Sequence, residues 1–223
     1  MGKLSFLLAE DYIKPKIYFK SKQSSTINDI FTSEDKKYFS GLENLARLLN
    51  APRGFIVNAF QIDYYQSLPR LIAKSLKKSH SFKKLYILGP ELSLSILKRS
   101  TKTIYETQYN GYEYINVEQD TDFVTSQCEK LIQEGHILYI LPETNVCWKP
   151  QYKSESDDIP HSLCSTLLSQ QLHVPILATA YENGSEKIKL FSPDSPDSYS
   201  GDLENRVFAQ SEALCRLLES TKK

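Results

Sequence analysis

Two polar segments of the chain carry carboxylates that could do acid–base chemistry. Asp63 comes shortly after the mainly apolar run 55–60, and Glu143 shortly after the apolar run 137–141. Either side chain could act as a general base or orient a substrate. Asp63 could equally cap a following helix, because an aspartate oxygen accepts hydrogen bonds from the first amide groups of a helix. Glu143 could belong to a site or to an ordinary polar loop.

Side chains close to these carboxylates could contact a substrate. They are Gln61, Tyr64, Tyr65, Asn145 and Cys147. A cysteine becomes a nucleophile when a base, a cation or a helix terminus lowers the pKa of its thiol. Cys147 has no histidine at a spacing that indicates such activation, so an inert thiol is the simpler interpretation. His161 and Cys164 could touch on one helix, but their spacing is more typical of packing than of a catalytic pair.

Periodic apolar residues, separated by turn-forming residues, predict the elements that position these side chains. Thr32 to Asp35 is a helix start, since a hydroxyl can cap the first amide groups. Helices are expected over 36–49, 64–78, 91–99, 120–134, 161–171 and 203–218. Strands are expected over 55–60, 84–88, 112–117, 136–141, 174–181 and 186–191.

This alternation predicts a single-domain α/β fold with a mainly parallel central sheet flanked by helices. We expect the domain to span 36–223, with 1–35 as an N-terminal arm. Asn183-Gly184 predicts a late antiparallel hairpin. In such folds the binding crevice lies beyond the carboxyl ends of the strands, so the loops that begin at Asn58 and Leu141 are the ones expected to form a site.

The composition argues against several classes of protein. The 27 basic and 27 acidic side chains give a formal net charge of zero, whereas nucleic-acid-binding proteins usually have a basic surplus. No apolar run approaches the roughly 18 residues of a membrane span, so we expect no integral membrane anchor. The four cysteines lack metal-binding spacing, which predicts free thiols, a cytoplasmic location and no metal site. Without a P-loop, a G-x-G-x-x-G or a G-x-S-x-G motif, we expect no nucleotide cofactor.

Three segments resemble motifs of the lysophospholipid/lipid A acyltransferase-like superfamily. Residues 40–45 and 54–59 resemble its "G-x-E-x-L" helix and the "G-(apolar)3-x-A-H" strand that follows. Residues 131–143 look like its "L-x-x-G-x-x-(apolar)-x-L-P-D/E" unit, and 163–178 are similar to its "A-x-x-x-x-x-P-V-V-P" segment. The resemblance covers roughly residues 38 to 191. It implies a protein that handles an acyl thioester, either acyl-CoA or acyl carrier protein.

The chain departs from the superfamily at the catalytic pair, a histidine followed five positions later by an acid. Phe60 and Tyr65 occupy those positions, and a slip by one residue gives Gln61 and Gln66. None of the four histidines has an acid five residues on, so the usual mechanism cannot run. The chain is then either an acyltransferase-like enzyme that uses Asp63 or Glu143 as its base, or an inactive homologue. An inactive homologue would act as a partner subunit or bind acyl groups or carrier protein.

Six basic residues lie close together in the sequence. They are Arg70, Lys74, Lys77, Lys78, Lys83 and Lys84. They predict either a solvated helix face or a landing surface for an acidic protein. Because acyl carrier protein is strongly acidic, the resemblance makes it the expected partner, with another protein subunit as the alternative. An unrelated Rossmann-like transferase is a weaker third possibility, since it needs a phosphate-binding loop that the sequence lacks.

Overall fold

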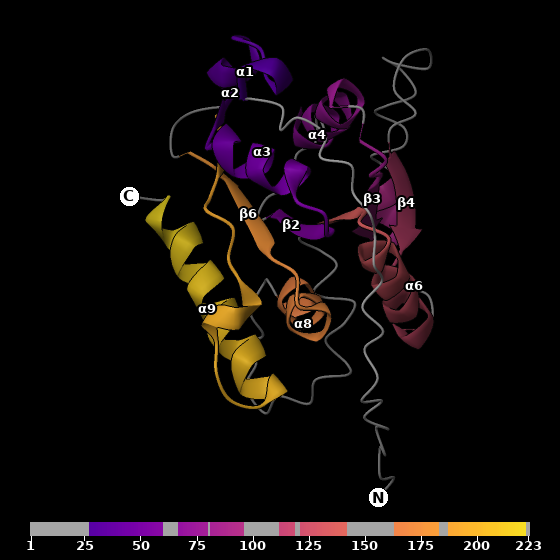
Figure 1. The fold of residues 1–223 in the computed structure, drawn as a ribbon. Helices are drawn as coiled ribbons and strands as arrows, with labels where there is room; N and C mark the ends of the chain where they lie inside the picture. Colours follow the sequence, from indigo (N-terminus) through magenta and orange to yellow (C-terminus); the bar gives the residue numbers. More distant parts are fainter. Residues whose placement is uncertain are drawn as a thin grey trace, which may run out of the picture.

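The computed structural model describes residues 27–59, 67–79, 81–95, 112–118, 121–141, 163–182 and 187–221 (Figure 1). These residues form the predicted α/β fold: a mostly parallel sheet with helices on both faces. Within the described part of the chain the sheet has seven strands in the order β1-β7-β6-β2-β5-β3-β4.

The strands agree closely with the ranges that the sequence predicts, apart from a short first strand. They are β1 Phe39–Ser40, β2 Phe55–Ala59, β3 Leu85–Gly89, β4 Tyr112–Asn116, β5 Ile137–Ile140, β6 Ile176–Tyr181 and β7 Ile188–Leu190. Strands β2 to β6 all run parallel, because β2 pairs with β5 and β6, and β3 pairs with β5 and β4. Strand β7 pairs antiparallel with β6, as the late hairpin requires. The turn expected at Asn183-Gly184 lies outside the described residues.

The described helices cover the two faces of the sheet. They are α1 Ile27–Ile30, α2 Asp35–Tyr38, α3 Leu42–Asn50, α4 Ser67–Lys78, α6 Thr121–Gln133, α8 Leu163–Leu172 and α9 Leu203–Ser220, and residues 91–95 are also helical. Helices α1, α3 and α4 pack against one face, whose core includes Val57 and Ile87. Helices α6, α8 and α9 pack against the other, whose core includes Ile56 and Leu138 (Figure 1). Because neighbouring strand residues point to opposite faces, β2 contributes to both cores.

The prediction of a single helix over 36–49 is wrong, because the helical conformation is interrupted between α2 and α3. Phe39 and Ser40 form β1 instead, which pairs in parallel with β7 at the edge of the sheet. Gly41 follows with a φ of +74°, a left-handed conformation that favours glycine. A Cβ on Gly41 would also collide with the carbonyl oxygen of Leu190. The strand pairing and this close approach to β7 together override the helical spacing of the apolar residues.

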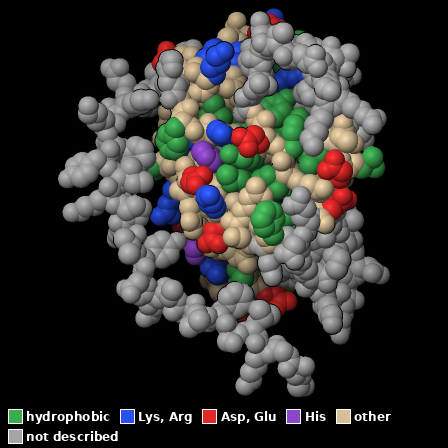
Figure 2. Space-filling model, turned by 90° about the vertical axis from the view of Figure 1, so that its right-hand side faces the viewer, with side chains coloured by type: hydrophobic (Ala, Val, Ile, Leu, Met, Phe, Trp, Pro, Cys, Tyr) green, Lys and Arg blue, Asp and Glu red, His purple; other side chains and the backbone are tan. Residues whose placement is uncertain are grey.

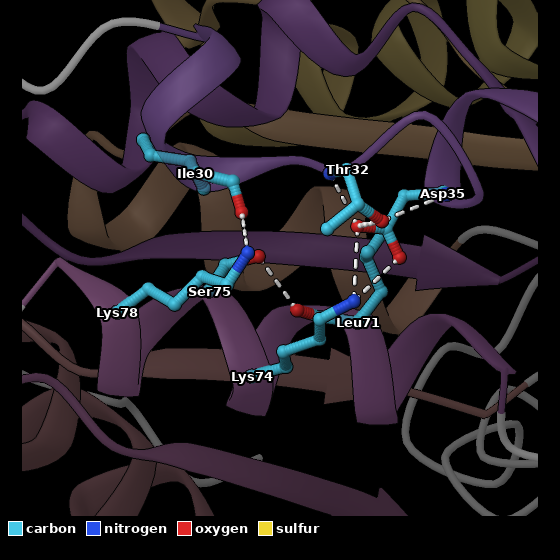
Figure 3. Close-up of polar contacts among 7 residues, drawn as sticks. All are labelled: Ile30, Thr32, Asp35, Leu71, Lys74, Ser75 and Lys78. Carbon is cyan, nitrogen blue, oxygen red and sulfur yellow. Dashed lines mark hydrogen bonds and ion pairs between the residues drawn. The ribbon is translucent and has the colours of Figure 1, made fainter.

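The helix start predicted over Thr32 to Asp35 is confirmed, because α2 begins at Asp35, and Thr32 forms reciprocal hydrogen bonds with that residue (Figure 3). The Asp35 backbone N–H donates to Thr32 Oγ1 at 3.2 Å, while the Thr32 backbone N–H donates to Asp35 Oδ2 at 2.7 Å. Ile30 and Phe31, just before this cap, are almost fully buried and belong to the core beneath α3 and α4. The segment before α2 therefore contributes Ile30 and Phe31 to this core.

Gly54 has a specific role where the chain enters β2. A Cβ at this position would collide with the backbone carbonyl of His136 and would lie 3.0 Å from the carbonyl oxygen of Ile132. Both of these carbonyls belong to the junction between α6 and β5. The absence of a side chain at Gly54 thus lets the entries to β2 and β5 pack directly against each other.

Candidate functional site

The carboxyl ends of β2 and β5 form the point where the connections of the sheet diverge. The chain leaving β2 leads to α4, whose Leu68 and Leu71 pack with Val57 on one face. The chain leaving β5 leads to α8, whose Leu168 packs with Ile140 on the other face. Adjacent parallel strands whose connections leave to opposite faces open a crevice at their carboxyl ends, and such crevices bind ligands in α/β folds. The ends of β2 and β5 are therefore the place in this sheet where the general rule for α/β folds predicts a site.

Asn58 lies next to the end of β2, at this point of divergence. It is level with Ile140 of β5 and Ala178 of β6, and both of these belong to the core beneath α8. Since residues that are level across a sheet share a face, the Asn58 side chain points toward that core. The side chain is fully buried, and neither Nδ2 nor Oδ1 has a hydrogen-bond partner. Each such group costs about 1–3 kcal/mol relative to a satisfied one.

The predicted catalytic and substrate-binding residues lie outside the described part of the chain. These are Asp63, Glu143, Gln61, Tyr64, Tyr65, Asn145 and Cys147. The described strands that lead to them end side by side, since Asn58 of β2 is level with Ile140 of β5. The two segments that carry the carboxylates therefore leave the same edge of the sheet from neighbouring strands, as expected.

Most of the six clustered basic residues are engaged in local contacts. The Lys74 ammonium lies 2.9 Å from Asp35 Oδ1, and Lys78 Nζ donates to the carbonyl of Ile30 at 3.2 Å (Figure 3). Burial by itself would raise the pKa of Asp35, but hydrogen bonds from Thr32 and the charge of Lys74 outweigh it and lower the pKa. These contacts hold the segment before α3 against α4.

The remaining basic residues do not extend the cluster into one surface. Arg70 lies on α4 beside Tyr112, where it opposes the effect of burial on the pKa of that tyrosine, which is raised. Lys77 is exposed near the end of α4. Lys84 pairs with Glu113 at 3.1 Å on the surface. On the face in Figure 2, acidic and basic side chains alternate and do not gather in a block of one sign.

Lys83 departs most from the sequence-based expectation, because it is buried. Its ammonium donates to the carbonyls of Ala51 at 2.6 Å and Arg53 at 2.7 Å, in the segment that joins α3 to β2. Burial lowers the pKa of Lys83 to about 8. The residue therefore fixes the entry to β2 at the amino end of the sheet, opposite the proposed crevice.

A second group of buried polar side chains, between α8 and α9, shares several hydrogen bonds, although Gln170 Oε1 has no partner. Gln210 donates to Asp194 Oδ2 at 2.6 Å and to Ser169 Oγ at 3.2 Å, and it accepts from Gln170 at 2.7 Å. The Tyr199 hydroxyl donates to Asp194 Oδ1 at 2.8 Å. Burial raises the pKa of Asp194, and burial together with the Asp194 contact raises that of Tyr199. This network joins α8, α9 and the segment before α9.

An open groove of about 450 Å³ lies at the far edge of the sheet, around β1 and β7. Its described lining includes Ser40, Asn44, Glu182, Lys189 and Leu217. In the strand order, β7 and β6 separate β1 from β2. The groove and the divergence point between β2 and β5 are thus distinct places.

The described residues do not bring together three metal-binding side chains, and none of their helices is long and apolar enough to cross a membrane. No protein-family model matches the sequence, and no curated protein is significantly similar to it.

Asn58 is the functional candidate that the sequence reasoning did not include. One signal was present in the sequence: an asparagine inside a run that otherwise reads as a fully buried parallel strand. Such strands are normally apolar throughout, so a carboxamide there needs either a partner or a purpose.

Proposed function

We propose that the protein binds an acyl thioester, from acyl-CoA or acyl carrier protein, at the carboxyl edge of its sheet. One observation carries this proposal. The three segments that resemble the acyltransferase-like superfamily contribute β2, β5 and β6, which are the adjacent central strands β6-β2-β5. Segments far apart in the sequence thus form one continuous unit around the divergence point.

The contacts within that unit support the same proposal. Gly54, from the first resembling segment, packs directly on the carbonyls of Ile132 and His136 from the second. The need for glycine at this position of the "G-(apolar)3" strand is therefore explained in this chain: only a residue without a side chain allows the entries to β2 and β5 to pack against each other.

For the chemistry, we propose that Asp63 or Glu143 replaces the missing histidine as general base. The base would take the proton from an acceptor hydroxyl or amine while that group attacks the thioester carbonyl; the C–S bond would then break, and the thiolate would leave and take up that proton. Positioning the activated thioester next to the acceptor supplies much of the rate gain, so a weaker base suffices.

A second function is favoured by Phe60, which stands where the superfamily has its histidine. A chain without that base would bind acyl groups or carrier protein, or act as a subunit of a larger enzyme. The basic cluster gives a carrier-protein surface little support, because Lys74, Lys78, Lys83 and Lys84 all have local partners.

The location of the protein also belongs to this proposal. Cys128, Cys164 and Cys215, in the described part of the chain, are not in disulfide bonds. Cysteines outside disulfides are typical of a reducing compartment, and we propose the cytoplasm.

The test is to incubate the purified protein with a mixture of acyl-CoAs and acyl carrier proteins and to record intact and native mass spectra. A bound or transferred acyl group is the expected result. The variants Asp63→Asn and Glu143→Gln should lower transfer, whereas Glu204→Gln, an exposed control on α9, should not. Binding without transfer in every variant would favour the inactive homologue, and no binding at all would contradict the proposal.

A further inference from the structure

The inference concerns His136, the residue just before β5 at the amino end of the sheet. Its ring nitrogen Nδ1 accepts a hydrogen bond from the backbone N–H of Lys84 at 3.2 Å. The next residue, Ile137, donates its backbone N–H to the carbonyl of Lys84 at 2.9 Å. Because Lys84 directly precedes β3, these two hydrogen bonds join the entry of β3 to the entry of β5.

The direction of the first hydrogen bond fixes the protonation state of the ring. A backbone N–H can only donate, so Nδ1 must offer a lone pair, and His136 is neutral with its proton on Nε2. Once both ring nitrogens carry a proton, Nδ1 has no lone pair and the bond from Lys84 is lost. The side chain of His136 is only 13% exposed and packs against the ring of Tyr86, 5.5 Å away between centroids. The charged ring therefore also loses much of its hydration.

The charged groups around the ring act in both directions. Burial has the largest effect and lowers the pKa of His136, and the ammonium groups of Lys84 and Lys83 lower it further. Glu134, just after α6, has a carboxylate oxygen 3.5 Å from Nε2 and raises the pKa, as does Glu113 of β4. The balance keeps the pKa of the ring below its ordinary value of 6.5.

We propose that His136 is an acid-sensitive switch, which releases the entry of β3 from that of β5 when its ring takes up a second proton. Because the folded protein holds this proton less tightly than the unfolded chain does, the ring stabilises the fold above pH 6.5. This contribution is lost as the pH falls from 6.5 through the lower pKa of the folded state. The switch lies at the amino end and does not depend on the binding proposed at the carboxyl edge.

Two variants that carry the same carboxamide group test the switch. In His136→Asn the carboxamide oxygen can take the place of Nδ1, so the variant keeps an acceptor for the Lys84 N–H but cannot titrate. In His136→Gln the carboxamide lies one carbon further out, at the place of Nε2, so that acceptor is lost. Urea denaturation at pH 7.5 and at pH 5.5 measures the folding equilibrium constant of each protein.

The expected differences are set by one hydrogen bond. At pH 7.5, His136→Asn should match the wild-type protein, and His136→Gln should have a folding constant about fivefold lower. Between pH 7.5 and pH 5.5, the wild-type protein should lose about fivefold more than His136→Asn does. His173→Asn is the matched control, because it removes a half-exposed histidine at a positive φ that asparagine tolerates, and it should keep the wild-type loss.

Amide hydrogen exchange of the wild-type protein locates the loss and needs no variant. The Lys84 amide should lose protection at pH 5.5 relative to the Val117 amide, which donates to the carbonyl of Gly89 at the carboxyl end of β3. An unchanged ratio of the two protection factors would overturn the proposal, and this measurement decides if neither variant folds. An acid loss in His136→Asn as large as that of the wild-type protein would overturn it as well.

Discussion

The two ends of the central strand β2 differ in how the buried polar side chains next to them are hydrogen-bonded. At the amino end, Lys83 donates to two backbone carbonyls, His136 Nδ1 accepts from the backbone N–H of Lys84, and the Lys84 ammonium pairs with Glu113. At the carboxyl end, the side chain of Asn58 has no partner. Satisfied polar groups stabilise a fold, whereas an unsatisfied one lowers stability and is typical of a functional position. The comparison agrees with a stabilising role for the amino end and with our proposal that ligands bind at the carboxyl end.

The largest effect is expected from Gly54→Ala at the amino end. The added methyl group collides with the carbonyl of His136, and backbone atoms on both sides cannot move independently. We expect the free energy of unfolding to fall by about 3 kcal/mol in urea denaturation. At the carboxyl end, Gly89→Ala meets the side chain of Leu141, which can turn away, and should cost less than half as much. Equal losses would contradict the contrast between the two ends.

Lys83→Met should have the next largest effect. The carbonyls of Ala51 and Arg53 lose their shared donor, and we expect the free energy of unfolding to fall by about 2 kcal/mol. Lys77→Met is the matched control, because Lys77 is exposed, and it should change stability by less than about 0.5 kcal/mol. A loss for Lys83→Met no larger than that of the control would show that Lys83 does not fix the entry to β2.

Asn58→Leu should change stability in the opposite direction. It removes two buried polar atoms that have no partner, so we expect the free energy of unfolding to rise by about 1 kcal/mol. Urea denaturation of the variant beside the wild-type protein measures the sign directly. A decrease would place Asn58 among the stabilising residues and remove the contrast.

The pH dependence of stability should report the burial of Lys83. The pKa of this residue is 10.5 in its ordinary state and about 8 in the folded protein, so the unfolded chain binds more protons between these values. Stability therefore rises with pH in this window, by about 1 kcal/mol between pH 8 and pH 9. Urea denaturation at both pH values measures the rise, and it should be absent in Lys83→Met. An identical rise in that variant would assign it to other groups.

The smallest effect is expected from Lys84→Met. Lys84 and Glu113 form an exposed pair in which both side chains are more than half accessible to solvent. Such pairs contribute little to stability and are screened by salt. The urea midpoint should match that of the wild-type protein within error, in contrast to the adjacent Lys83→Met. A clear loss would mean that the pair is part of the amino-end network.

The sequence predicted the mainly parallel sheet because β2, β5 and β6 are short apolar runs between amphipathic helices, whereas its prediction of a binding edge stays a prediction. It missed β1, since Phe39, Leu42 and Leu45 have helical spacing and nothing local indicates the pairing of Phe39 with Ile188. Strand pairing between distant segments is a tertiary effect, and it overrides local periodicity.

The individual polar residues were harder to predict than the elements. The sequence analysis placed Lys83 in an exposed basic cluster, because lysine is rarely buried. Its two carbonyl partners lie about 30 residues earlier in the chain, so no local pattern indicates the contact. Asn58 could be noted as a polar residue in an apolar strand, but whether it had a partner depends on the strands and helix that pack around it. Whether a buried polar group has a hydrogen-bond partner is decided only when the whole fold is assembled.

The position of β2 also has a consequence for biosynthesis. Both strands that pair with β2 come much later in the chain, at Ile137–Ile140 and Ile176–Tyr181. While the chain emerges from the ribosome, both edges of this apolar strand stay open until β5 is made, and one edge stays open until β6 is made, more than a hundred residues after β2. Unpaired strand edges associate readily with other chains. A ribosome-bound chain halted before β6 is therefore the species of this protein most in need of a chaperone.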